Sequence, residues 1–131
     1  MQIKQASQAS GLAARTIRYY ESRGLIHSQR SPNGYRHYHH DDIERLQFLN
    51  RARHLGFSLD ECADLLALHR DPNRASQAVL AIAEQHLVDI DAKIDQLQQM
   101  KGQLTDWVQR CPGDASSECA ILDGLSHSQA S

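Results

Sequence analysis

The spacing of apolar residues at the start of the chain predicts two short helices joined by a tight turn. Residues 3–10 and 13–23 both follow a helical pattern, which breaks at Gly11. Because glycine readily takes the left-handed conformation that ends many helices, Gly11 suits the turn between them. In the second helix Ile17 and Tyr20 fall near one face. The order helix, short turn, helix is the helix-turn-helix layout.

Residues 28–39 change from helical spacing to alternation. Asn33-Gly34 is typical of a tight β-turn, and aromatic and basic residues alternate after it from Tyr35 to Tyr38. The pattern predicts a small two-stranded hairpin, which would be the wing of a winged helix-turn-helix.

Two further helices are expected after this hairpin. Asp41 or Asp42 is expected to cap the third helix, because short acidic side chains favour that position and apolar residues then recur at helical spacing. Ser58 and Glu61 form a capping-box pattern at the start of the fourth helix, which we expect to end near Pro72.

A continuous heptad pattern follows, from about Ser76 to Arg110, and is typical of a coiled coil. Lys101 is the one polar residue at an a position, where such residues set register at some cost in stability. A helix of this length reaches about 50 Å, so we expect it to pair with the same helix of a second chain. The apolar a positions are Leu80, Leu87, Ile94 and Val108, and the d positions are Ala83, Ile90, Leu97 and Leu104.

Together these elements predict a mainly α-helical protein with four parts. We expect a winged helix-turn-helix domain at 1–70, a dimerisation helix at 71–110, and a loop with a short C-terminal helix at 111–125. Residues 126–131 are polar and are expected to be disordered.

The charge distribution along the chain predicts a polyanionic partner. The 131 residues contain no run of about 18 apolar residues and no signal-peptide pattern, so we expect a cytoplasmic protein with no membrane contact. The formal net charge of −2 hides an asymmetry. Residues 1–40 carry six Lys or Arg against one Glu, whereas residues 71–131 carry four against nine acids. A basic head is typical of proteins that bind a polyanion.

The second helix of a helix-turn-helix lies in the major groove of DNA, while neighbouring residues bind phosphates. Arg15, Arg18 and Tyr19 or Tyr20 are therefore candidates for DNA contact, and Arg36 on the wing can reach a nearby phosphate. The alternative is that these charges are simply solvated.

The motifs of the head also resemble those of a known family, the MerR-type transcription regulators. The resemblance is specific over residues 1–70, and the long helix extends it to nearly the whole chain. It is carried by Gly11-Leu12, Thr16-Ile17-Arg18-Tyr19-Tyr20-Glu21, Gly24-Leu25, Asn33-Gly34-Tyr35-Arg36-His37-Tyr38, Ile43-Glu44-Arg45-Leu46 and Leu55-Gly56-Phe57-Ser58-Leu59-Asp60-Glu61.

This resemblance implies a homodimer with antiparallel dimerisation helices and two winged heads on double-stranded promoter DNA. It adds Thr16, Asn33 and Tyr35 to the expected DNA contacts. It also implies that the effector-bound dimer distorts an over-long promoter spacer so that RNA polymerase can use the promoter.

Cys111 and Cys119 flank a Pro-Gly turn just after the long helix. Thiolates favour soft ions such as Cu(I), Zn(II) and Hg(II). Zinc normally takes four ligands, and the loop adds Asp114 and Glu118 but no histidine. Two thiolates alone suit a monovalent ion with linear two-coordinate binding. A redox-active pair and a metal-free loop are the alternatives.

The pattern Cys-Pro-Gly-Asp-x4-Cys resembles the metal loop of the copper efflux regulators within the MerR family. Members that bind divalent metals have a third cysteine at the start of the dimerisation helix, where this chain has Ser76. The resemblance therefore implies a Cu(I) effector held by Cys111 and Cys119, with Ag(I) and Au(I) also plausible.

Three functions follow. The first is a Cu(I)-responsive activator of copper efflux and detoxification genes, and the second is the same regulator tuned to Ag(I), Au(I) or Zn(II). The third, from another class, is a thiol metal-buffering protein. We expect no enzymatic activity, because no phosphate-binding loop, nucleophile elbow or HExxH pair occurs in the sequence. Cys62 is expected to be a thiol of the core.

Overall fold

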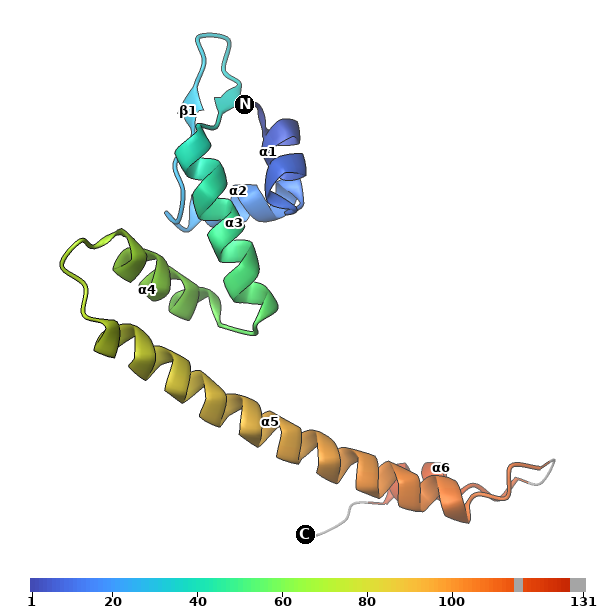
Figure 1. Cartoon of the computed structure of the whole chain (residues 1–131). Coiled ribbons are helices and arrows are strands. Elements are labelled where there is room, and N and C mark those ends of the chain that lie inside the picture. Colours follow the sequence, from blue (N-terminus) through green and yellow to red (C-terminus); the bar gives the residue numbers. More distant parts are fainter. Residues whose placement is uncertain (115–116, 128–131) are drawn as a thin grey trace. The chain divides into compact units, whose positions relative to one another are not determined.

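The computed structural model describes residues 1–114 and 117–127. The chain forms two compact units, Met1–Ala83 and Glu84–Ser131, which are described separately below (Figure 1). The division falls inside helix α5 (Ser76–Arg110), so the first turns of α5 belong to the N-terminal unit.

The N-terminal unit begins with the expected helix-turn-helix. Helices α1 (Ile3–Ser10) and α2 (Ala14–Ser22) are joined at Gly11, which has a φ of 77°. The amide of Gly11 donates to the carbonyl of Ser7 and so closes the last turn of α1. The prediction of two short helices is confirmed, with α2 one residue shorter at each end than the 13–23 pattern.

The predicted wing is also present. Strands β1 (Gln29–Arg30) and β2 (Arg36–His37) pair antiparallel, with Arg30 opposite Arg36. Gly34 has a positive φ of 86° in the connecting turn, where its amide donates to the carbonyl of Ser31.

Helices α3 (His40–His54) and α4 (Leu59–Arg70) complete the head. The expected cap at Asp41 or Asp42 is wrong, because His39 occupies the cap position of α3. Asp42 instead reaches back from the third helical position and accepts a hydrogen bond of 2.9 Å from the amide of His39. A short acidic side chain can bind free amides of the first turn from the cap position or from the third helical position. The sequence pattern therefore does not distinguish these two positions.

The capping box predicted for α4 is confirmed. The hydroxyl of Ser58 accepts from the amide of Glu61 at 3.1 Å, and the Glu61 carboxylate accepts from the amide of Ser58 at 2.8 Å.

One hydrophobic core holds the head together, with α3 packed against both α1 and α4. Cys62 is fully buried in it and its thiol donates to the carbonyl of Phe57 at 3.8 Å, so the prediction of a core thiol is confirmed. Burial raises the pKa of Cys62, which keeps it a neutral thiol. The largest fully buried side chains are Tyr38, Ile17, Ile26, Leu46, Leu49 and Cys62.

Helix α5 carries an uncovered apolar stripe. Its large a and d residues from Leu80 to Val108 are mostly 48–60% exposed in the single chain, and Ile90 is partly buried. Exposed apolar stripes of this length mark interaction surfaces, and the heptad spacing fits a coiled coil. Within the described residues, no helix has both the length and the apolar character that spanning a membrane requires.

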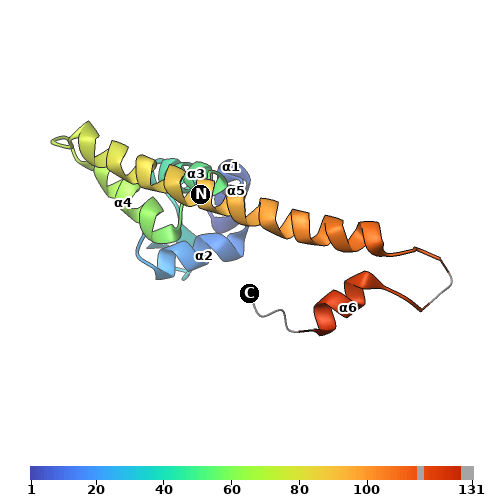
Figure 2. The ribbon, with the colours of Figure 1, turned by 90° about the horizontal axis from the view of Figure 1, so that it is seen from below.

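The C-terminal unit ends in a short helix, α6 (Ala120–Ser126), that packs against the end of α5 (Figure 2). The backbone of Gly124 lies against the indole of Trp107, so close that a Cβ there would be 2.4 Å from the ring carbon Cε2. Ser126, expected in a disordered tail, is the last residue of α6, and His127 follows with its ring bonded to the carbonyl of Asp123 at 2.8 Å. The rest of that expected tail, 128–131, lies outside the described residues.

Candidate metal loop and nucleic-acid surface

The loop between α5 and α6 brings the two predicted metal ligands together. The amide of Cys111 donates to the carbonyl of Trp107 at 3.1 Å, which continues the helical bonding of α5. Cys119 is the cap residue of α6, and its carbonyl accepts from the amide of Asp123 at 3.1 Å. Both cysteines are half-buried, and their sulfurs lie 3.8 Å apart. Each thiol is therefore held at the end of a helix.

The surroundings of Cys119 favour its thiolate. The backbone amide of Leu122 is the main cause that lowers the pKa of Cys119, and the thiol of Cys111 contributes in the same direction. Hydrogen bonds donated to a sulfur stabilise its anion, and the thiolate is the form that binds metals. In this pair of donors the thiolate form of Cys119, which binds a soft cation, is therefore favoured.

The separation of the sulfurs fits a two-coordinate ion better than a disulfide. Two metal–thiolate bonds of about 2.3 Å would place the sulfurs about 4.6 Å apart across a linear centre. The observed distance between the sulfurs of 3.8 Å would have to grow by about 1 Å to reach it. A disulfide requires closure to about 2.05 Å. Among the described residues, no carboxylate or imidazole joins these sulfurs in a cluster of three or more donors.

Ser76, the predicted selectivity residue, opens α5 and is exposed. It lines a mainly apolar groove of about 700 Å³ with Val79, Leu80 and Ala83. Ser76 belongs to the N-terminal unit and the two cysteines to the C-terminal unit, so its role at the loop stays a prediction.

The predicted DNA contacts on α2 divide into exposed and buried side chains. Arg15 and Arg18 are exposed, Tyr19 is 50% exposed, and Thr16 is half-buried. Tyr20 is only 5% exposed and packs in the core, so Tyr19 is the member of the pair whose ring meets solvent. The helical period places neighbouring residues on different faces, and packing against the rest of the head decided between them.

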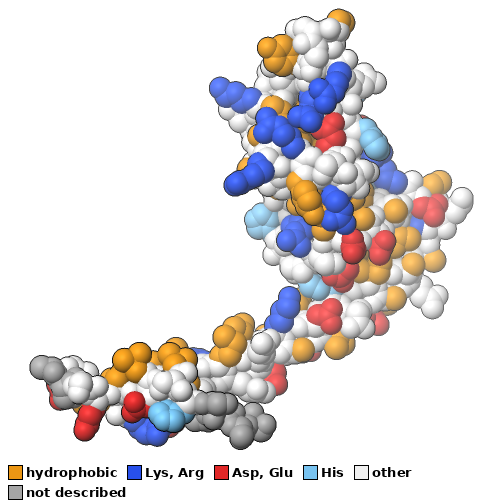
Figure 3. Space-filling model, turned by 180° about the vertical axis from the view of Figure 1, so that it is seen from behind, with side chains coloured by type: hydrophobic (Ala, Val, Ile, Leu, Met, Phe, Trp, Pro, Cys, Tyr) orange, Lys and Arg blue, Asp and Glu red, His pale blue; other side chains and the backbone are white. Residues whose placement is uncertain are grey.

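The wing brings further cations to the same surface. A groove of about 180 Å³ is lined by Arg18 of α2 and by Arg30, Tyr35 and Arg36 of the wing. Tyr35 is 60% exposed, and Asn33 is exposed in the wing turn, where it accepts a hydrogen bond from the Ser31 hydroxyl. Figure 3 shows Lys and Arg side chains gathered over one face of the N-terminal unit. We name the residues lining this groove the arginine groove: Arg18, Arg30, Tyr35 and Arg36, with Gln2, Ile3 and Gly34.

Arg30 was missing from the residues that the sequence singled out. The structure pairs Arg30 with Arg36 across the hairpin. A two-residue turn at Asn33-Gly34 would have set Arg30 opposite His37, so the three-residue turn from Pro32 to Gly34 is what brings the two arginines opposite each other.

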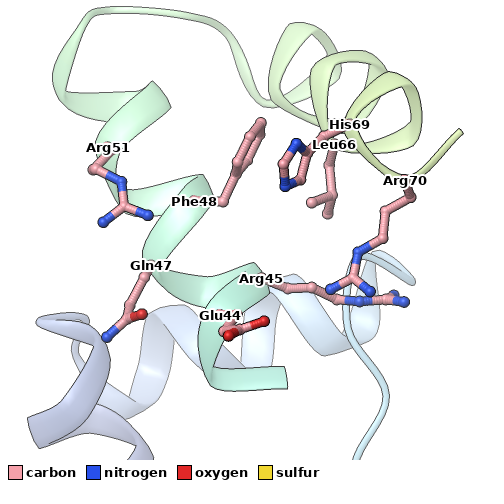
Figure 4. Close-up of a pocket in the computed structure, with 8 residues that line it drawn as sticks. All are labelled: Glu44, Arg45, Gln47, Phe48, Arg51, Leu66, His69 and Arg70. Carbon is pink, nitrogen blue, oxygen red and sulfur yellow. The ribbon is translucent and has the colours of Figure 1, made fainter. Parts of the chain in front are cut away.

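A second groove, of about 530 Å³, lies between α3 and α4 (Figure 4). The rings of Phe48 and His69 stack across it with centroids 5.1 Å apart. Arg70 and Arg45 both bind the carboxylate of Asp41, at 2.7 and 3.3 Å, and Arg70 is the main cause that lowers the pKa of Asp41. These contacts tie the start of α3 to the end of α4.

Comparison with known proteins agrees with this architecture. A family model described as "MerR HTH family regulatory protein" matches residues 1–68, and one described as "MerR, DNA binding" matches residues 43–107. The transcriptional regulator HmrR of Rhizobium leguminosarum bv. viciae is 48% identical over 126 residues, 96% of this chain and 98% of that protein. The regulator CueR of Vibrio cholerae is 43% identical over 126 residues, which cover 95% and 91% of the two chains.

Among solved structures, the transcription regulator PbrR691 of Ralstonia metallidurans CH34, in complex with lead(II), superposes with a TM-score of 0.78. It shares 30% sequence identity, and the match covers 95% of this chain and 98% of that one. The family model covers more than half of the chain, and the relatives and the solved structure match it over nearly its full length. The chain therefore belongs to the MerR family of helix-turn-helix transcriptional regulators.

Proposed function

We propose that this protein is a Cu(I)-responsive transcriptional activator that binds promoter DNA as a homodimer. The observation that carries the proposal is the pair of thiols, 3.8 Å apart, on a loop between two helices of a MerR-family regulator. A pair of soft donors so placed suits a soft effector ion.

The choice of a monovalent ion rests on charge and on donor number. Two thiolates around a +1 ion leave a centre with a net charge of −1, which the amide of Leu122 near Cys119 helps to stabilise. The serine at position 76, which adds no third thiolate at the start of α5, supports the same choice. Ag(I) and Au(I) have the same preference for two sulfurs and are the nearest alternatives. A divalent ion such as Zn(II) would need further ligands.

Dimerisation would be supplied by the apolar stripe on α5. An antiparallel coiled coil would cover its a and d residues from Leu80 to Val108 and give the assembly two heads. Two-fold symmetry would then match two half-sites in the promoter. Arg15, Arg18 and Tyr19 of α2 would read the major groove, and Arg30 and Arg36 on the wing side of the arginine groove would bind phosphates.

In this mechanism Cys111 and Cys119 would hold the ion, which would supply a soft cationic centre for their thiolates. Cys111 follows α5 and Cys119 is the cap residue of α6, so holding the ion would also fix α6 to the dimerisation helix. That local ordering would favour the dimer conformation that bends and underwinds an over-long promoter spacer. RNA polymerase could then engage both promoter elements and transcribe copper efflux genes.

The test is transcription in vitro from the native promoter against a series of metals. We expect Cu(I), buffered at low free concentration, to raise transcript levels, and removal of the ion by a Cu(I) chelator to return them to the basal level. Ag(I) and Au(I) are expected to act at higher or similar concentration, and Zn(II) is expected to have no effect. Promoter binding with no response to any metal would favour a regulator with another effector, and metal binding without promoter binding would favour a thiol buffer.

Changing Ser76 to cysteine should broaden the metal response toward Zn(II). A third thiolate adds a donor and a negative charge, both of which a divalent ion needs to complete its site. We expect transcription to rise with Zn(II) in this variant, with Ser76→Ala as the matched control that adds no donor. An unchanged metal profile in Ser76→Cys would contradict the selectivity role.

A further inference from the structure

We propose that Glu21 is a positioning residue that fixes the wing to the recognition helix α2, so that both meet DNA as one surface. This inference rests on the proposed DNA-binding function and assigns to Glu21 the positioning of the wing for that function.

One carboxylate at the end of α2 is bound by donors from both sides of the wing. The Oε2 atom of Glu21 forms an ion pair with Arg36, whose Nε lies 3.1 Å away, and accepts a hydrogen bond from the hydroxyl of Tyr38 at 3.2 Å. The other oxygen, Oε1, accepts from the hydroxyl of Ser28. Ser28 directly precedes β1, Arg36 lies in β2, and Tyr38 directly follows β2. Glu21 therefore ties the two ends of the hairpin to a single point on α2.

The surroundings make this cluster stronger than a surface ion pair. The side chain of Glu21 is 21% exposed and that of Arg36 is 32% exposed, so solvent screens the pair only partly. Burial alone would raise the pKa of Glu21, but the hydrogen bonds from Ser28 and Tyr38 and the charge of Arg36 outweigh it and lower the pKa. Burial and the Glu21 carboxylate raise the pKa of Tyr38 to about 12, so its hydroxyl keeps the proton it donates.

An acidic side chain beside a DNA-binding surface needs a physical reason, because it repels phosphates. Here the carboxylate orients a cation of the arginine groove, since Arg36 lines that groove with Arg18 and Arg30. The guanidinium of Arg36 faces Glu21 with its Nε as an ion pair, and its terminal nitrogens form the other part of a rigid fork. An arginine already held in place loses less conformational entropy when it binds a phosphate.

The test compares promoter binding by Glu21→Ala, Glu21→Gln and wild type in the full-length dimer. We expect Glu21→Ala to weaken binding about tenfold. The slope of log K against log salt should become shallower by about 0.9 for each phosphate that the variant no longer neutralises. Hydroxyl-radical footprints should lose protection under the wing and keep it under α2. Glu21→Gln keeps one acceptor oxygen, for either Tyr38 or Ser28, and loses the charge, so it should be intermediate.

Glu44→Ala is the matched control, because it removes the same charge from an exposed position on α3, where Glu44 pairs with His40 at 3.2 Å. We expect this variant to bind at least as tightly as wild type. Equal or tighter binding by Glu21→Ala, with an unchanged salt slope and footprint, would overturn the inference. If Glu21→Ala proves unfolded by circular dichroism, the same readouts on Glu21→Gln decide. Failure of wild type to bind the promoter would instead overturn the proposed function.

Discussion

Replacing Cys111 or Cys119 with serine is expected to abolish metal-dependent transcription while leaving promoter binding within about twofold of wild type. A serine hydroxyl is a hard donor that stays protonated at neutral pH, so it does not replace a thiolate for a soft monovalent ion. The two sulfurs lie in the C-terminal unit, whereas the arginine groove and the exposed face of α2 lie in the head. Transcription in vitro with Cu(I) and promoter affinity by fluorescence anisotropy measure the two effects separately.

Cys62→Ser is the matched control for this experiment, because it makes the same atomic change at a buried thiol of the head. We expect its response to Cu(I) to persist. Normal Cu(I) activation by either Cys111→Ser or Cys119→Ser would show that the loop is not the effector site.

Replacing Gly124 with valine is expected to displace α6 and weaken both metal binding and activation. A Cβ at this position would lie 2.4 and 2.5 Å from two ring carbons of Trp107, far inside van der Waals contact. Overpacking of this kind costs about 1–3 kcal/mol. Because Cys119 is the cap residue of α6, a shift of the helix also moves one of the two sulfurs. If that free energy falls entirely on the metal-bound form, affinity decreases about 5- to 150-fold.

Competition with a Cu(I) chelator measures this affinity, and the fluorescence of Trp107 reports the displacement of α6. Trp107→Ala combined with Gly124→Val removes the clash and should restore part of the affinity. Gly102→Ala is the control, since a Cβ at Gly102 of α5 meets nothing within 4 Å and the position lies outside the a/d stripe. Wild-type affinity in Gly124→Val would show that docking of α6 on Trp107 plays no part in metal binding.

The sequence predicted the elements of the head because each has a local cause. Gly11 ends α1, the Asn33-Gly34 turn closes the wing, and the Ser58–Glu61 box starts α4, all within a few residues of chain. Such signals depend on backbone geometry and short-range hydrogen bonds, which the sequence shows directly.

Three features of the structure depend on tertiary packing and could not be predicted from the sequence pattern alone. Helical spacing places Tyr20 on the face of Ile17, but only the packing of α2 on the rest of the core shows that this face is the buried one. Docking of α6 depends on the absence of a side chain at Gly124, which no periodicity reports. The chemistry and spacing of the loop cysteines indicate a metal site, whereas their 3.8 Å separation depends on both helices being in place.

The buried thiol of Cys62 can report local opening of the DNA-binding unit. The protein has three cysteines, and a thiol with no exposed surface reacts with a disulfide reagent only when the core around it opens. Exchange at Cys62 in a Cys111→Ser, Cys119→Ser chain would therefore report the free energy of local opening of the DNA-binding unit. Measured with and without promoter DNA, that rate would give the rigidity gained on binding, with no label added to the molecule.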